Sequence, residues 1–182
     1  MTEYNFVNAK DIEDWAERID SRSDLPDLIR RLILATSNPS KIKFRAQEEI
    51  DYGGWDGYVD ASTGTAFVPK GKSGWEVSTR QDIMVKANMD YDDRFEDPSS
   101  VNPQETTFVF CTPRRWPGKA DWVKQKDEER EWNEVRVHDV DDIHAWLPDA
   151  PVVHVWFSRK IGKPVTYVQD LYSWWENRLD SA

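Results

Sequence analysis

The sequence predicts an α/β fold with a central mixed β-sheet flanked by helices, and three observations lead to it. The N-terminal third carries apolar residues at helical spacing, and the segment from Lys41 to about Thr79 has the pattern of strands. Farther along, the apolar run TTFVFCTP is typical of a strand buried on both faces, as in a parallel or mixed sheet. Helices and strands then alternate, so helices packed on a sheet are the simplest arrangement. With 182 residues, we expect one domain over 1–182.

Two helices are expected at the N-terminus. Asn8 can cap the segment DIEDWAERID, in which one face collects Ile12, Trp15, Ala16 and Ile19. A turn around Ser21–Asp24 then leads to the helix LPDLIRRLILAT, with Pro26 near its first position. Asn38-Pro39 ends this second helix, whose apolar stripe consists of Leu25, Leu28, Ile29, Leu32 and Ile33.

Short strands and turns follow. KIKFRA alternates polar and apolar residues, and after the break at Gly53-Gly54 the segment WDGYVD predicts a short strand. ASTG predicts a turn, TAFVP a second strand, Gly71 to Gly74 another turn, and WEVST a third strand.

The C-terminal half alternates between helices and strands. A helix is expected from Gln81 to Phe95, with Ile83, Ala87 and Tyr91 at four-residue steps, and a loop from Asp97 to Glu105. After the buried strand TTFVFCTP come a helix at DWVKQKDEEREW, a strand at EVRVHDV and a helix at DDIHAWL that ends near Pro148. Residues 150–182 are expected to form a further helical extension. Its end, YVQDLYSWWENRLDSA, could pack on this domain, mediate a dimer or lead into a partner domain.

Composition narrows the function classes. With 24 Lys+Arg against 34 Asp+Glu, the net charge is −10, so either a local basic groove lies on an acidic body or nucleic acid is not a partner. No apolar stretch is long enough for a transmembrane helix, and the acidic N-terminus is unlike a secretion signal. The single cysteine, Cys111, is expected to be a buried, inert thiol, and a reducing cytoplasm is the expected location. Most of the 10 tryptophans are assigned to packing.

Two acidic residues form the candidate site. Asp56 opens a strand directly after two glycines, and Glu76 follows 20 residues later in a neighbouring strand. The hairpin between them can place both carboxylates on one face, with Trp75 and Val77 pointing into the core and Glu76 and Ser78 toward a cleft. Two nearby carboxylates repel unless a cation lies between them, and Mg²⁺ suits such an oxygen site. The alternative is that both acids are solvated surface groups, although the tryptophans before each acid favour rigid, half-buried strands.

The chain has an acid, a hairpin and a second acid on the next strand, followed by helix, strand, helix and strand. This order resembles the PD-(D/E)xK nuclease superfamily, which has the restriction-endonuclease-like fold. The segments WDG, VPKGKSGWE, KAN-DY and TPRRW are together similar to the N-terminal nuclease domain of large bacterial STAND NTPases of antiphage defence, over about residues 8–175. The resemblance implies a Mg²⁺-dependent (or Mn²⁺-dependent) endonuclease that acts on DNA in antiviral defence, joined to an NTPase sensor or assembled as a homo-oligomer.

The resemblance also implies roles for particular residues. Asp56, Glu76 and the backbone carbonyl of Val77 would hold the metal ion. The lysine usual two residues after the second acid is Ser78 here, and Lys86 on the following helix is the candidate replacement; the alternative is that Lys86 pairs with Asp82 or Asp90. Weaker candidates for the lysine's role are Lys70 and Lys72, and further ligands or water contacts could come from Gln47, Glu48 or Glu49.

Three basic clusters could bind DNA phosphates. They are Lys70 and Lys72 in the turn before Glu76, the cluster Arg114, Arg115, Trp116 and Lys119 after the buried strand, and Arg30-Arg31 on the second helix. The alternatives are that the second cluster packs on the protein's own carboxylates and that Arg30-Arg31 is structural. His138, His144 and His154 lack metal-ligand spacing, and neither a phosphate-binding glycine loop nor a serine-nucleophile motif is present. Two function classes remain, a metal-dependent nuclease and a catalytically inactive module of the same fold that binds nucleic acid or a partner protein.

Overall fold

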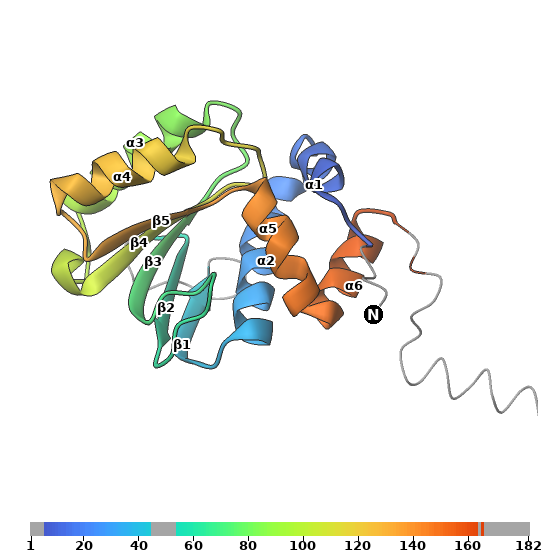
Figure 1. Cartoon of the computed structure of the whole chain (residues 1–182), viewed down its shortest axis with the longest axis horizontal. Helices are drawn as coiled ribbons and strands as arrows, with labels where there is room; N and C mark the ends of the chain where they lie inside the picture. Colours follow the sequence, from blue (N-terminus) through green and yellow to red (C-terminus); the bar gives the residue numbers. More distant parts are fainter. Residues whose placement is uncertain (1–5, 45–53, 164, 166–182) are drawn as a thin grey trace, which may run out of the picture.

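The computed structural model describes residues 6–44, 54–163 and 165 of the chain. Its sheet has five strands in the order β1-β2-β3-β4-β5 (Figure 1). β1 to β3 pair antiparallel, whereas β3, β4 and β5 run parallel, so the predicted mixed α/β sheet is confirmed. The strands span Pro39–Phe44 (β1), Gly57–Ala61 (β2), Gly71–Val77 (β3), Thr106–Cys111 (β4) and Glu134–His138 (β5).

Helices cover both faces of the sheet. Figure 1 shows α3 and α4 over one face, while α2 and α5 lie against the other, next to α1 and α6. The α-helices span Ala9–Ala16 (α1), Ser21–Thr36 (α2), Ile83–Glu96 (α3), Lys119–Glu129 (α4), Val140–Trp146 (α5) and Pro151–Lys160 (α6). Two short 3-10 helices, Pro103–Glu105 (η1) and Leu147–Asp149 (η2), precede β4 and follow α5. No helix among the described residues combines the length and the apolar character needed to cross a membrane.

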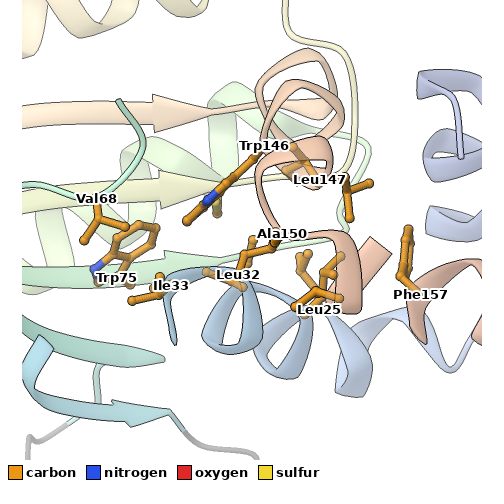
Figure 2. Close-up of a cluster of buried hydrophobic side chains, with 14 of the residues drawn as sticks. Leu25, Leu32, Ile33, Val68, Trp75, Trp146, Leu147, Ala150 and Phe157 are labelled. Carbon is orange, nitrogen blue, oxygen red and sulfur yellow. The ribbon is translucent and has the colours of Figure 1, made fainter. Parts of the chain in front are cut away.

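The face toward α2 and α5 carries the larger apolar core. All five predicted stripe residues of α2 are buried in it. Figure 2 shows Trp75 of β3 beside Val68 and Ile33, with Trp146 of α5 nearby. Cys111 belongs to this core, which confirms that it is buried, and burial raises the pKa of its thiol.

The face toward α3 and α4 is packed mainly by aromatic rings. Tyr91 of α3 meets Phe108 of β4 edge-on at 5.2 Å, and Trp55 meets Trp132 edge-on at 5.5 Å. Edge-to-face rings stabilise a core beyond the area that they bury. The assignment of most tryptophans to packing is therefore confirmed for the described residues.

The N-terminal helices differ in extent from the prediction. Asn8 caps α1 through a capping box with Asp11, as expected for this sequence. However, α1 ends at Ala16, and Ile19 is 93% exposed, so its placement on the buried face was wrong. The expected turn at residues 21–24 is instead the first turn of α2, and the Ser21 hydroxyl donates to the carbonyl of Arg18 at the corner between the helices.

The predicted three-stranded meander was also wrong in one element. TAFVP forms a turn, because the Thr65 hydroxyl accepts hydrogen bonds from the N–H groups of Phe67 and Val68. β3 starts at Gly71, inside the predicted second turn, and pairs directly with β2. The glycine at 74 reflects packing, because a Cβ atom there would come within 2.6 Å of the Trp55 ring.

The remaining elements follow the predicted order. Every residue of β4 is buried, as expected for a strand covered on both faces. Ala87 and Tyr91 are buried on α3, and the helix at DDIHAWL gives way to η2 at Leu147. The first part of the predicted C-terminal helical extension is α6, whereas its end, with the paired tryptophans, lies outside the described residues.

Candidate functional site

Asp56 and Glu76 face each other across the two antiparallel strands β2 and β3. Gly57 pairs with Trp75, so the register extended by one residue places Asp56 opposite Glu76. Side chains directly opposite in such a pair lie on the same face, with Cβ atoms roughly 5 Å apart. The Oδ2 atom of Asp56 accepts a hydrogen bond of 3.0 Å from the backbone N–H of Val77, which fixes the carboxylate beside the end of β3.

Glu76 lies on the α3 side of the sheet, whereas its neighbour Trp75 packs into the opposite core. The expected cleft at Glu76 was wrong, because the side chain is only 3% exposed. Burial and the charges of Asp56 and Asp90 raise the pKa of Glu76 to about 9, and Arg94 opposes this rise. A carboxyl group with such a perturbed pKa, buried beside two others, is a candidate functional group.

Arg94 is the residue of this site that sequence reasoning missed. Its Nε donates to Oε1 of Glu76 at 2.7 Å, and its guanidinium lies 5.7 Å from the centre of the Trp55 ring. Gly54 makes room for it, since a Cβ atom there would come within 2.2 Å of Nη1 of Arg94. The available signal was spacing, because Arg94 follows Asp90 by four residues and so lies on the same helical stripe.

Lys86 and Asp90 complete this stripe of α3. Lys86 forms an ion pair with Oδ1 of Asp90, one of the two pairings that the sequence left open as alternatives to a catalytic role. Asp90 is only 3% exposed, and its other oxygen, Oδ2, is buried without a hydrogen-bond partner among the described residues. Since Asp90 also acts electrostatically on Glu76, the structure brings Lys86 to the edge of the acidic cluster.

The carboxylates around Glu76 are possible ligands of a metal ion. Among the described residues, no group of three or more His, Cys, Asp or Glu side chains has the arrangement to hold a metal ion by itself. Mg²⁺ is nevertheless often bound by one or two carboxylates, completed by water and substrate phosphate. Asp56 and Glu76 supply two carboxylates, of which Glu76 is also in contact with Arg94, and the Oδ2 atom of Asp90 is a further buried acceptor.

Ser78 and Lys72 have hydrogen-bond or ion-pair partners outside this cluster. The buried Ser78 hydroxyl accepts a hydrogen bond from the N–H of Arg80. Lys72 pairs with Glu105 near the start of β3, four residues before Glu76, which is about 13 Å along a strand. The placement of Lys70 and Lys72 in a turn beside Glu76 was therefore wrong. Gln47, Glu48 and Glu49 lie outside the described residues.

The cluster after β4 contacts the protein's own carboxylates. Arg114 binds Glu17 and the carbonyl of Thr79, and Arg115 binds Glu13 and Asp141. Trp116 is buried against Phe110 and Trp122, and Lys119 bridges Asp139 and Asp142. On the second helix, Arg31 pairs with Asp27 and stacks on Trp156. Arg31, Arg114, Arg115 and Lys119 thus have partners within the protein, which is the alternative that the sequence left open.

Two of the three histidines, His138 and His154, are buried in packing contacts. His138 is buried, lies within 2.8 Å of the Phe67 carbonyl through Nε2, and stacks on Trp75. His154 accepts a hydrogen bond from the N–H of Val7 through Nε2. Both contacts tie together segments that are far apart in the sequence.

Comparison with known proteins adds no family assignment. No protein-family model, no curated protein and no solved structure matches this chain. A functional assignment therefore depends on the geometry of the site and on the chemistry of its residues.

Proposed function

We propose that the protein is a metal-dependent nuclease that hydrolyses phosphodiester bonds of DNA, with Mg²⁺ or Mn²⁺ as the cofactor. One observation carries the proposal: Asp56 and Glu76 lie opposite each other on one face of the sheet. Such a pair of carboxylates repels in the absence of a cation, and a divalent ion relieves the repulsion.

The order of the elements supports the same proposal. The first acid precedes β2, the second lies in the neighbouring strand β3, and α3, β4, α4 and β5 follow. This is the order of elements on which the resemblance to the PD-(D/E)xK superfamily depends. The restriction-endonuclease-like fold is accordingly part of the proposal.

The side chains around the pair have distinct roles in this mechanism. Asp56, Glu76 and the carbonyl of Val77 would hold the ion, which supplies an activated water and neutralises the scissile phosphate. Asp90 would orient that water through its buried oxygen Oδ2. Negative charge that develops on the phosphate would be stabilised by Lys86, the sequence candidate, together with Arg94, the cation in contact with Glu76.

The biological setting is part of the proposal as well. A nuclease of this kind would serve as an effector in bacterial antiphage defence. An unregulated nuclease is toxic to its own cell, so activity would depend on self-association or on a fused NTPase sensor. The near-complete burial of Glu76 agrees with a site that needs a rearrangement before it accepts DNA.

Plasmid nicking with Mg²⁺ or Mn²⁺ tests the assignment. The substitutions Asp56→Ala and Glu76→Gln should each lower the nicking rate by about 100-fold or more, because each removes a ligand of the ion. Asp60→Ala is the matched control, since Asp60 lies on the same strand but at its other end. An Asp56→Ala protein as active as the parent would remove this site from consideration.

A second candidate is an inactive module that binds nucleic acid or a partner protein. The contact of Arg94 with Glu76 favours it, because the guanidinium already supplies a positive charge to that carboxylate. The effect of Mg²⁺ on the melting temperature separates the two candidates. Stabilisation that disappears in Glu76→Gln supports the nuclease, and no effect of any divalent ion on melting supports the module.

A further inference from the structure

A pocket of about 490 Å³ opens beside the end of β3. Its lining comes from the start of α2, from the last residue of β3 and from the segment that follows: Arg22, Leu25, Val77, Ser78, Thr79 and Arg80. The pocket thus lies at the carboxyl end of the parallel strands, where open α/β sheets bind ligands. Its volume falls within the range of small-molecule sites, which is enough for one nucleotide unit.

The pocket adjoins the acidic pair through a single residue. Val77 contributes to the lining, and its backbone N–H is hydrogen bonded to Asp56 at 3.0 Å. A strand of nucleic acid whose phosphate lay at Asp56 and Glu76 could therefore place a neighbouring phosphate in this pocket.

The lining is suited to an anion. Arg22 and Arg80 are both exposed, and Ser78 and Thr79 add hydroxyl groups. Arg80 pairs with Asp82 on the surface, and an exposed pair of this kind is weak enough to exchange its carboxylate for a phosphate. The first turn of α2, the positive end of that helix, carries Arg22, and no side chain of the N-cap residue Asp20 caps it.

We propose that this pocket binds a phosphate of the DNA backbone next to the scissile one, with Arg22 and Arg80 as its ligands. The inference rests on the proposed function, because it takes Asp56 and Glu76 as the place of cleavage. It also accounts for DNA binding by a chain of net charge −10, since two exposed cations line a pocket that reaches Val77, the residue whose N–H is hydrogen bonded to Asp56. Lys70, Lys72 and the cluster after β4 are then not needed for this contact.

Binding of a fluorescein-labelled DNA duplex of about 20 base pairs tests the inference, with the whole chain in EDTA and over a range of salt. Arg22→Gln and Arg80→Gln should each raise the dissociation constant by about 5-fold to 10-fold and lower the salt slope by about one. Arg18→Gln is the matched control, because Arg18 forms an equally exposed pair with Asp20 outside the pocket lining. It should leave both quantities unchanged.

The possible outcomes test the phosphate pocket and the nuclease site separately. If the parent binds duplex DNA and both pocket variants bind it equally well with the same salt slope, the pocket inference is overturned, and nicking by the parent decides the nuclease separately. Weaker binding by both variants in a protein that does not nick DNA supports the pocket as a phosphate site and favours the inactive module that binds nucleic acid. A parent that binds no duplex DNA overturns the pocket inference.

Discussion

Adjacent residues of β3 lie in opposite environments, and the contrast between the two faces of this strand separates folding from function. Trp75 points toward α2 and α5, where apolar side chains surround it. Glu76 points toward α3, where it meets Arg94 and the charges of Asp56 and Asp90. Burial stabilises the first side chain, whereas burial of the second is unfavourable because a charge loses its hydration.

The burial of Glu76 lowers the stability of this protein. A buried carboxylate with two acidic neighbours is more costly than an apolar or amide side chain of similar size, even with Arg94 in contact. Proteins tolerate such groups chiefly at functional sites, where the strain serves binding or chemistry. The Trp75 face therefore maintains the fold, and the Glu76 face is the place to look for activity.

The largest expected effect comes from the apolar face. Trp75→Ala should lower the free energy of unfolding by about 3–5 kcal/mol, because it leaves a large cavity between β3 and α5. The measurement is urea unfolding followed by circular dichroism. Met84→Ala, on the exposed side of α3, is the control and should change stability by less than about 0.5 kcal/mol. A loss below about 1 kcal/mol for Trp75→Ala would show that the two faces do not differ in this way.

On the Glu76 face, a substitution is expected to raise the free energy of unfolding rather than lower it. Glu76→Gln should stabilise the metal-free protein by about 1–2 kcal/mol near neutral pH, because the amide is neutral without a proton, whereas the buried Glu76 carboxyl must hold one that the unfolded chain releases. The melting temperature in EDTA should rise by roughly 2–8 °C. Glu105→Gln is the exposed control and should have little effect, because Glu105 lies in η1 and pairs with Lys72 near the other end of β3.

The pH dependence of this gain follows from linkage. The raised pKa of Glu76 means that the folded protein keeps this proton up to about pH 9, whereas the unfolded chain releases it near the ordinary value of 4.5. The unfolded state is therefore favoured increasingly as pH rises through this window, and stability falls. The difference between Glu76→Gln and the parent should grow with pH. A difference that shrinks as pH rises would contradict the described environment of Glu76.

Much of this contrast could be predicted from the sequence. The alternation of Trp75 and Glu76 follows from the period of a strand, and the pairing of Asp56 with Glu76 follows from an antiparallel hairpin. The buried stripe of α2 and the fully buried β4 were predictable for the same reason, since their apolar residues have a clear local period.

The features that the sequence did not predict depend on contacts between distant residues, which a local pattern does not contain. Arg114 looked free to bind phosphate, but its partner Glu17 precedes it by 97 residues. Arg94 was not a candidate, but it reaches back 18 residues to Glu76, with its guanidinium against Gly54. Arg22 and Arg80 come together because the start of α2 lies beside the end of β3.

The smallest expected effect concerns the titratable group on the apolar face. His138 lies against Trp75 and Trp146, and burial lowers the pKa of its imidazole from 6.5 to about 4. Below about pH 6.5 the unfolded chain takes up a proton that the folded chain refuses until about pH 4, so stability falls as pH decreases through this window.

This dependence of stability on pH at the acid side has the sign opposite to that of Glu76, and it reports on the apolar face alone. The contribution of His138 should amount to about 1 kcal/mol of lost stability between about pH 7.5 and about pH 5.5. Urea unfolding of the parent and of His138→Gln at both pH values measures it, and the variant should lose less stability on acidification even if it is less stable throughout. Equal losses in the two proteins would mean that His138 is protonated in the fold, which the close packing of two indole rings and the Phe67 carbonyl around it argues against.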